Sequence, residues 1–435
     1  MDSRHRVVIV GGGFGGLYAA QALGKADVQV TLIDRRNFHL FQPLLYQVAT
    51  GGLSPANIAA PLRDVLKRQK NTRVLLGEVV RFDLERRLVI LKDGTEPYDS
   101  LIVAAGSQPH YFGHPEWEQF APSLKTIEDA TAIRRRVLSA FELAERCTDP
   151  EDCRALMTFI IVGGGPTGVE LAGAIAEVAH STLRGNFRSI DPAKSRIILL
   201  EGVDRILTAY PPKLSAKAVK SLNRLGVTVR TGTVVTDVQA DRVTIRSGDQ
   251  TETIRAHTVL WAAGVEASPL AKALAQATGA ELDRAGRIIV QPDLSLPNHP
   301  EVFVLGDMVN YPYQGGKPLP GLAPVAMQQG RYVADLIQRR LRGAPPVPFH
   351  FRDHGSMATI GRAAAVADLG WISFSGWLAW LAWLFVHILF LIEFQNRVLV
   401  LFQWAWNYFT RNRAARLITF SESPVKEIGS TKGAR

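Results

Sequence analysis

VVIVGGGFGGLYAAQAL, residues 7–23, joins a short apolar run to a glycine turn and the start of a helix. In its G-x-G-x-x-G pattern, Gly11, Gly13 and Gly16 allow the backbone to turn from strand to helix and to approach a pyrophosphate. The free N–H groups and the dipole of the helix N-terminus favour negative charge at that point. The pattern therefore predicts a dinucleotide-binding turn, although an ordinary glycine turn can look the same.

An internal repeat strengthens this prediction. FIIVGGGPTGVELAGAI at 159–175 matches the first stretch, and Gly163 follows Gly11 by 152 residues. LIVAAG at 101–106 and VLWAAG at 259–264 form a second pair with an offset of 158 residues. Two markers with nearly one offset indicate two similar nucleotide-binding domains.

An acid at the end of the next strand should bind ribose hydroxyls. VQVTLID ends at Asp34, which lies 18 residues after Gly16. RIILLE ends at Glu201, which lies 33 residues after Gly168, so we expect additional helix or loop around residues 181–194. The second copy fits the pattern more loosely than the first.

The charge of Glu201 would repel a 2′-phosphate, which favours NADH over NADPH. Arg205 is close enough in sequence to weaken that preference, and a solvated acid at a strand end is the alternative interpretation. The expected dinucleotide contacts are the loops, the strand-end acids and the two Ala-Gly turns: Gly11, Gly12, Gly13, Phe14, Gly15, Gly16, Asp34, Arg35, Ala105 and Gly106 in the first copy, and Gly163, Gly165, Pro166, Thr167, Gly168, Glu201, Ala263 and Gly264 in the second.

Length and composition limit the other possibilities. A chain of 435 residues is long enough for two or three domains, and its net charge of +10 permits contact with anionic lipid, nucleic acid or a phosphorylated ligand. Basic residues do not gather on one predicted helix of the body, which disfavours nucleic acid. Cys147 and Cys153 are too few for a disulfide framework, an iron–sulfur cluster or a structural zinc, so redox chemistry requires an organic cofactor. The opening MDSRHR lacks a leader pattern, and we expect the body to stay in the compartment where it is made.

A third apolar strand, VFVLGD at 302–307, ends in glycine and acid. With the repeat, it makes the chain resemble the flavoproteins that have two nested dinucleotide-binding domains. The resemblance implies FAD on the first copy, NADH on the second, and contact of Asp307 with the flavin side of FAD; a helix N-cap is the alternative for Asp307. The expected division is 1–117 with 288–345 for FAD, 118–287 for NADH, and 346–435 as a membrane-anchoring domain.

Four strings narrow the resemblance: HLFQPLLYQVATG at 39–51, GSQPHYFG at 106–113, GGPTGVELAG at 164–173 and APVAMQQG at 323–330. Together they closely resemble type II NADH dehydrogenases, which are single-chain, non-proton-pumping NADH:quinone oxidoreductases on the membrane surface. Disulfide reductases of the superfamily need two reactive cysteines near the flavin, where this chain has the first string instead. The resemblance implies that electrons pass directly from the flavin to a membrane quinone.

The resemblance also implies site residues. The family's quinone motif often reads Ala-Gln-x-Ala-x-Gln, but Pro324 stands at its first Gln. Ala326 and Gln328 match the rest, so a flavin or quinone contact by Gln328 is expected. Glu170, on the first turn of the second nucleotide-binding helix, matches a family Glu between nicotinamide, flavin and quinone and is a candidate proton relay. A helix-start acid favoured by the dipole is the alternative for Glu170.

The C-terminal region is rich in aromatic residues: six of the eight Trp lie within 371–406. Residues 371–394 have few polar breaks and as one helix could cross a bilayer. A single crossing would leave Arg411, Arg413 and Arg416 on the far side, against the positive-inside tendency. Residues 398–409 place polar and apolar side chains on opposite helical faces, which is typical of an interfacial helix whose arginines meet anionic head groups.

We therefore expect monotopic attachment to the lipid surface, on the cytoplasmic side of the cell inner membrane, and a homodimer. One spanning helix and burial of the apolar region in a dimer interface are the alternatives. His387 and Glu393 are further candidate proton donors, although a lone His in an apolar helix is more typical of packing.

The predicted fold class is α/β, with two nested Rossmann-like domains and a C-terminal membrane-associated helical segment. The predicted function is NADH oxidation through FAD coupled to quinone reduction. A reductase of a soluble acceptor such as ferredoxin or rubredoxin, and a non-catalytic sensor or scaffold that binds NADH and FAD, are the alternative functions.

Overall fold

The computed structural model describes residues 4–410 and 412–419, and the chain folds into two compact units. The first contains the residues up to Leu40, Ala59–Pro109 and Val265–Asp353. The second contains Phe41–Ile58, His110–Gly264 and the residues from His354 on. Each unit carries one of the two glycine loops, and the finer division into FAD, NADH and anchoring domains stays a prediction.

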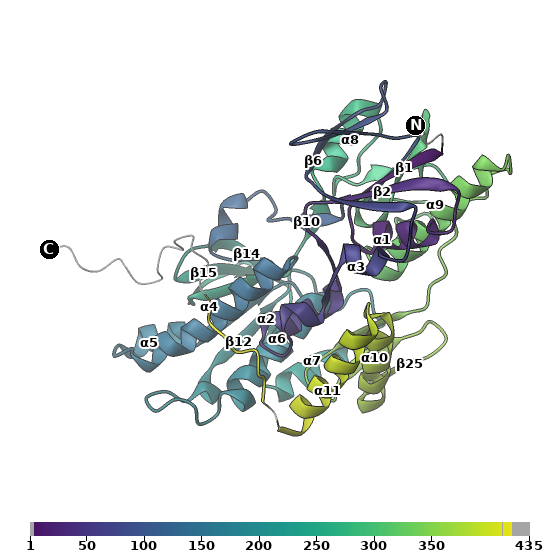
Figure 1. Cartoon of the computed structure of the whole chain (residues 1–435). Helices are drawn as coiled ribbons and strands as arrows, with labels where there is room; N and C mark the ends of the chain where they lie inside the picture. The colour runs from purple at the N-terminus through teal and green to yellow at the C-terminus, as the bar shows by residue number, and fades with distance from the viewer. Residues whose placement is uncertain (1–3, 411, 420–435) are drawn as a thin grey trace. The chain divides into compact units, whose positions relative to one another are not determined.

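A six-stranded sheet with the order β20-β21-β9-β1-β2-β5 forms the core of the first unit (Figure 1). All neighbours pair in parallel except β20 with β21. Val7 to Val10 of β1 are at most 4% exposed, as expected for a continuous apolar strand covered on both faces. The strands in sheet order are Ser295–Leu296, His299–Val304, Ser100–Val103, His5–Val10, Val28–Asp34 and Thr72–Leu76.

Two helices of this unit, α1 (Phe14–Ala22) and α9 (Ala323–Leu341), pack at a glycine contact. A Cβ on Gly330 would lie 2.3 Å from the backbone oxygen of Gly15, so only glycine allows this approach. The remaining helices and strands are α3 (Leu62–Leu66), α8 (Leu270–Thr278), β3 (Phe38–Leu40), β4 (Ala59–Pro61), β6 (Val79–Asp83), β7 (Leu88–Leu91), β8 (Thr95–Pro97), β10 (Ser107–Pro109), β18 (Val265–Ala267), β19 (Ile288–Ile289) and β22 (Val309–Asn310).

The second unit contains a parallel four-stranded sheet with the order β13-β12-β11-β17. Its strands in that order are Val227–Arg230, Arg196–Leu200, Thr158–Val162 and Thr258–Trp261. In both units the strand before the glycine loop lies between the strand before the acid and the strand before Ala-Ala-Gly, which confirms the repeat. The extra segment expected around 181–194 contains a π-helical turn, Val178–Thr182, and a 3-10 turn, Pro192–Lys194.

Helices and a second, antiparallel sheet complete the part of this unit that carries the glycine loop. The helices are α4 (Ile127–Glu145), α5 (Pro150–Leu156), α6 (Pro166–Glu177) and α7 (Pro212–Arg224), and the sheet contains β14 (Thr233–Val238), β15 (Arg242–Ser247) and β16 (Gln250–Arg255). The short helix α2 (Leu45–Ala49) belongs to the same unit.

The C-terminal part of the second unit begins with a meander of β23 (Ser356–Thr359), β24 (Ala365–Asp368) and β25 (Ser373–Gly376). Helices α10 (Trp377–Phe390) and α11 (Phe394–Thr410) follow, and they contact through Trp383 and Trp404, whose rings lie 5.3 Å apart. Figure 1 shows the two helices side by side in yellow and yellow-green.

The alternative in which residues 371–394 form one spanning helix is wrong, because the structure divides this segment. Its first residues form β25, and Gly376, with a φ of 88°, separates the strand from α10. Glu393, with a φ of 72°, separates α10 from α11. Among the helices of the described ranges, none is both long and apolar enough to cross a membrane.

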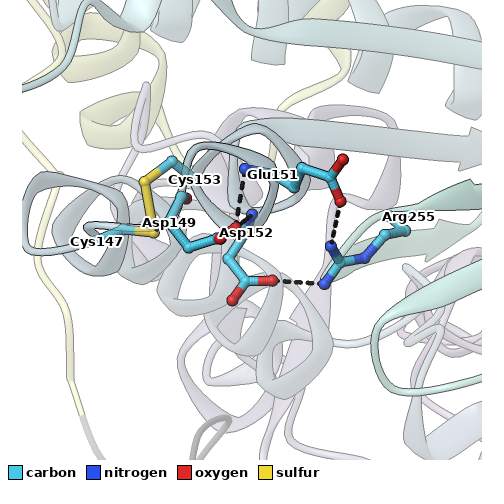
Figure 2. Close-up of a disulfide and its surroundings, with 6 residues drawn as sticks. All are labelled: Cys147, Asp149, Glu151, Asp152, Cys153 and Arg255. Carbon is cyan, nitrogen blue, oxygen red and sulfur yellow. Dashed lines mark hydrogen bonds and ion pairs between the residues drawn. A yellow bond between two sulfur atoms is a disulfide. The ribbon is translucent and has the colours of Figure 1, made fainter.

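A disulfide between Cys147 and Cys153 closes the loop from α4 to α5 (Figure 2). Sequence analysis assigned no disulfide, but the turn brings the two Cα atoms to 5.5 Å, within the usual range for a disulfide. Asp149 caps α5 by accepting the N–H of Asp152 at 2.8 Å. Arg255 of β16 pairs with the side chain of Asp152 and so joins the loop to the antiparallel sheet.

Candidate active site

The first glycine loop is held by backbone contacts that only glycine permits. Gly11 has a φ of 104°, and a Cβ there would lie 2.4 Å from the oxygen of Ala104. Gly12 donates its N–H to Oδ2 of Asp34 at 2.6 Å. Burial raises the pKa of Asp34, while the N–H groups of Gly12 and Arg36 oppose the shift. The acid predicted for ribose thus also fixes the loop, and Arg35 beside it is exposed.

His39, on β3, contacts the first glycine loop, a role that was not predicted from the sequence. Its Nδ1 lies 2.9 Å from the carbonyl oxygen of Gly12, so Nδ1 must carry the donated proton. The imidazole is 1% exposed and makes an edge contact with Phe14 at 4.9 Å. Burial lowers the pKa of His39 to about 4, so the ring is neutral at physiological pH.

The second loop repeats this construction. Gly164 donates its N–H to Oε2 of Glu201 at 2.6 Å, and Val203 donates to Oε1 at 3.1 Å. Gly163 has a φ of 110°, and a Cβ there would lie 2.7 Å from the backbone of Ala262. A Cβ on Gly168 would lie 1.8 Å from the oxygen of Gly163, so the helix begins directly against the loop.

Both helix N-termini have space for an anion. Gly13 caps α1 and Gly165 caps α6, and neither has a side chain that could occupy the first N–H groups of its helix. Apart from the adjoining residues of the chain, no described atom lies within 4 Å of the position that a Cβ would take on either glycine. Pro166 and Thr167, which follow Gly165, are exposed. Each loop therefore fits a diphosphate.

The Ala-Gly turns lie in the units of their respective loops. Ala105 directs its N–H to the sulfur of Met308 at 3.2 Å, and Gly106, with a φ of 71°, accepts the N–H of Ser268 at 3.0 Å. In the second unit Ala263 precedes Gly264, where a Cβ would meet the ring of Phe112 at 2.8 Å.

Asp307 lies in the unit of the first loop, where Ser107 donates its hydroxyl to Oδ2 of Asp307 at 2.7 Å. The adjacent Gly306 donates its N–H to Oε1 of Gln329 at 2.7 Å, and Gln329 is 1% exposed. Gln329 was not predicted from the sequence, because it adjoins the matched motif without belonging to it.

The two matched residues of that motif lie on α9. Ala326 is buried, and its backbone oxygen is 3.6 Å from the position of a Cβ on Gly15. The amide of Gln328 bonds to the backbone of Arg352 in both directions, at 2.9 Å and 3.0 Å. The structure thus places Ala326 beside α1, whereas the side chain of Gln328 holds the segment after α9.

Arg205, which was expected to weaken the selection against a 2′-phosphate, has its guanidinium engaged locally. It donates to the carbonyl oxygens of Tyr210 at 2.7 Å and Thr208 at 2.8 Å, and to the hydroxyl of Ser215 at 3.1 Å. These contacts hold the guanidinium of Arg205 against the segment 208–215.

Glu170 is the fifth residue of α6, one turn later than expected, and is 9% exposed. Burial raises the pKa of Glu170 to about 8. The N–H of Thr359, at 3.5 Å from Oε1, opposes this shift. Burial raises the pKa of Tyr46 on α2 and of Tyr210, and the charge of the Glu170 carboxylate raises both further. Glu170 is therefore a carboxylic acid at neutral pH and has a proton to donate.

His387 takes the packed position that is typical of a lone His in an apolar helix. His387 donates from Nδ1 to the carbonyl oxygen of Trp383 at 2.7 Å and stacks on that ring at 4.3 Å. Burial lowers its pKa to about 4, so it is a packed neutral ring rather than an imidazolium donor. Glu393 lies at the turn between α10 and α11.

Of the arginines after α11, Arg413 differs from expectation. Arg413 does not face head groups: it pairs with Glu177 at 2.7 Å, and the two side chains are 13% and 18% exposed. Arg416 donates to the carbonyl oxygen of Arg413 at 2.8 Å. Arg411 lies outside the described residues.

The outer sides of α10 and α11 are strongly apolar. Phe402, Trp406 and Phe409 are 70%, 65% and 82% exposed, whereas Asn396 on the opposite side of α11 is 8% exposed. We call the exposed large apolar side chains of the two helices the apolar face: Trp377, Leu378, Leu381, Phe385, Leu389, Phe390, Leu399, Leu401, Phe402, Trp406 and Phe409. So many exposed large apolar side chains on two packed helices indicate an interaction site.

Comparisons with known proteins place the chain among flavoenzymes. The model of the pyridine nucleotide-disulphide oxidoreductases matches residues 5–330, and that of the NDH2 C-terminal domain matches residues 354–412. Two relatives from Mycobacterium tuberculosis, the type II NADH:quinone oxidoreductases Ndh and NdhA, are 48% and 49% identical. Each alignment covers 96% of this chain and 90% of the relative.

Solved structures agree on the fold. NDH2 from Plasmodium falciparum superposes with TM-scores of 0.86 in its complex with RYL-552 and 0.85 in its complex with NADH. The sequence identities are 20% and 21%, and each match covers 96% of this chain and 100% of the other. These similarities concern the whole path of the chain, including its C-terminal part.

Proposed function

Because the chain belongs to the type II NADH:quinone oxidoreductases, we propose that its two glycine loops divide the reaction between FAD and NADH. The enzyme oxidises NADH and reduces a quinone without pumping protons. The loop of the first unit binds FAD, with Asp34 and Asp307 as ligands from the same unit. The loop of the second unit binds NADH, with Glu201 at the adenosine ribose.

The assignment rests on one observation: each glycine loop is held by a hydrogen bond to a strand-end acid. Gly12 donates its N–H to Asp34, and Gly164 donates its N–H to Glu201. Each leaves a helix N-terminus open to a diphosphate, as two dinucleotides require. Bound FAD supplies the two-electron chemistry that joins NADH oxidation to quinone reduction. The two cysteines lie at the start of α5 and just before it in the second unit, whereas residues 39–51, where disulfide reductases carry their reactive pair, contain no cysteine.

Glu170 is the proposed proton donor to the quinone. Its buried carboxyl holds a proton at neutral pH because burial raises its pKa to about 8. A quinone takes up two protons with its two electrons, so a protonated acid on the helix of the second loop suits this step. Gln328 remains the proposed flavin or quinone contact from α9, as the family motif implies.

The apolar face of α10 and α11 is the proposed attachment to a lipid bilayer. Its Trp and Phe side chains suit the boundary between head groups and acyl chains, and the polar side of α11 faces the protein. We place the enzyme as a monotopic protein on the cytoplasmic side of the cell inner membrane. A homodimer belongs to the same proposal, since part of the apolar face could also meet a second copy.

Turnover tests the proposed reaction. Anaerobic NADH should bleach the flavin absorbance of the purified protein, and a short-chain quinone should restore it through many cycles. Ferredoxin or rubredoxin should restore it slowly or not at all. A protein that binds FAD and NADH but turns over no quinone would be a sensor or scaffold and would contradict the proposal.

A further inference from the structure

The inner side of α11 and the segment after it bond to one short stretch, residues 47–52, which we call the docking turn. Trp404 donates its Nε1–H to Oε1 of Gln47 at 2.7 Å, and Asn407 donates to the carbonyl oxygen of Gly52 at 3.2 Å. Further along, Ala415 donates its N–H to the oxygen of Gly51 at 3.2 Å. The helix that carries half of the apolar face is thus joined to the end of α2.

Arg413 extends this connection to α6. Its guanidinium donates to Oγ1 of Thr50 at 2.7 Å on one side and to Oε2 of Glu177 at 2.7 Å on the other. The other oxygen of Glu177 accepts the backbone N–H of Arg362, which follows β23. The charges of Arg413 and Glu177 are largely shielded from water. Removal of either charge leaves the other without its partner, which lowers the stability of the fold.

The far end of this network lies on the helix that carries the proposed proton donor. Glu177 follows Glu170 by seven residues, about two helical turns, so both side chains lie on one side of α6. Tyr46, which precedes the docking turn, accepts the side-chain N–H of Gln47 at 2.9 Å. Its phenol also lies in the fields of Glu170, Glu177 and Arg413.

We propose that Arg413 and Glu177 are positioning residues for quinone reduction. They hold the docking turn and the Glu170 side of α6 against α11, so that the lipid-facing helix and the residues around the proton donor keep one arrangement. Their loss should impair the reaction with quinone but spare NADH oxidation by a soluble dye. This inference rests on the proposed function, in which α11 meets lipid and Glu170 serves the quinone.

Three variants of the FAD-loaded full chain test it. Arg413→Gln and Glu177→Gln each remove one charge of the buried pair, and Trp404→Phe keeps an aromatic ring but removes the hydrogen bond to Gln47. Arg255→Gln is the control, because it breaks an ion pair at the surface between β16 and α5 (Figure 2). Each is assayed with a water-soluble dye, a short-chain quinone and a long-chain quinone.

We expect kcat/KM for both quinones to fall about tenfold or more in the charge variants, since a small misplacement of catalytic groups slows the reaction. Dye reduction, the KM for NADH and FAD content should stay within about twofold, because these steps do not use the network. Trp404→Phe should show a smaller loss of quinone activity. If a charge variant fails to fold, the result for Trp404→Phe decides the test. Equal loss of dye and quinone activity, or no loss of either, would overturn the inference.

Hydrogen exchange separates this inference from the proposed function. In detergent, without lipid or quinone, amides of the docking turn should exchange faster in Arg413→Gln and Glu177→Gln than in the wild type, whereas β14–β16 should not change. Unchanged exchange at 47–52 would overturn the positioning role even if quinone is the acceptor. Faster exchange in a protein that neither binds vesicles nor uses Glu170 would support the network and reject the proposed function instead.

Discussion

The carboxylate of Glu201 accepts the backbone N–H of Gly164 at 2.6 Å, so this acid closes the second glycine loop from within. The residue therefore has two roles in the proposed site: it fixes the loop that receives the diphosphate, and its charge opposes a 2′-phosphate. A substitution that removes the carboxylate must affect both roles.

Glu201→Ala should raise the KM for NADH while FAD content stays unchanged, because FAD is assigned to the other unit. Loss of a charged hydrogen-bond acceptor is worth about 1.5–3 kcal/mol, so about tenfold or more in KM is expected. The kcat/KM for NADPH should rise little, because Arg205 already donates to Tyr210, Thr208 and Ser215. Steady-state kinetics with both nucleotides check this, and an unaltered ratio of kcat/KM values would remove Glu201 from the ribose site.

His39 should make the first loop sensitive to acid. Its pKa falls from 6.5 in the unfolded chain to about 4 in the folded one, so the unfolded state binds more protons between these values. Stability should therefore drop as the pH falls from about 6.5 to about 4, by up to about 1.4 kcal/mol per pH unit for this group. Thermal unfolding and FAD release across that range provide the measurement.

Two variants of His39 separate charge from hydrogen bonding. Asn can donate to the oxygen of Gly12 without titrating, so His39→Asn should retain FAD and lose much of the acid sensitivity. His39→Leu should weaken FAD binding at every pH. The same pH profile in wild type and His39→Asn would assign the acid sensitivity to other groups.

The loops were predictable because their chemistry is local. Gly11 and Gly163 need positive φ and close backbone approach, and these requirements are visible in the spacing of the glycines. His39 and Glu177 were missed because their contacts depend on the fold: the chain brings Arg413 to Glu177 across 236 residues. No single stretch of sequence contains such a pair.

The C-terminal helices show a different limit. Hydropathy treats 371–394 as one apolar run, but Gly376 at φ 88° and Glu393 at φ 72° divide the chain at positions that an apolar average does not register. The amphipathic pattern of 398–409 correctly predicted a helix with a polar and an apolar side. Arg413 was misassigned because charge alone does not reveal which partner satisfies it.

The apolar face should control membrane binding. Phe402→Ser combined with Phe409→Ser removes two side chains that are 70% and 82% exposed, so the fold should persist while vesicle binding falls. Each buried apolar side chain contributes about 1.5–3 kcal/mol, so a loss of about tenfold or more is expected. Cosedimentation with anionic vesicles measures it, and high salt should release little of the wild type.

Leu76→Ser is the matched control for this prediction, because Leu76 is 64% exposed but lies on β5 of the first unit. It should bind vesicles as the wild type does. Equal loss in both variants would mean that general surface hydrophobicity, and not the apolar face, drives attachment. A change in oligomeric state of the double variant without loss of vesicle binding would assign the face to a dimer.

The ionisation of Glu170 should affect both the stability of the fold and the rate of quinone reduction as the pH rises. Its pKa rises from 4.5 in the unfolded chain to about 8 in the folded one, so the folded state holds a proton that the unfolded state releases between these values. Stability should fall as the pH rises through that window, by up to about 1.4 kcal/mol per pH unit for this group. Glu170→Gln cannot titrate, so its advantage in thermal stability over the wild type should grow from pH 5 to pH 8.

The same substitution removes the proton that quinone reduction needs. Restoration of flavin absorbance by quinone should slow by at least about tenfold in Glu170→Gln, given the usual scale of general acid catalysis, while bleaching by NADH changes less. In the wild type the quinone step should decline above about pH 8, where the carboxyl ionises. Stopped-flow absorbance resolves the two steps. A variant that gains stability but keeps the wild-type quinone rate would make Glu170 a buried structural acid, and the protons would have to arrive through water or from Glu393, because His387 is neutral and packed against Trp383.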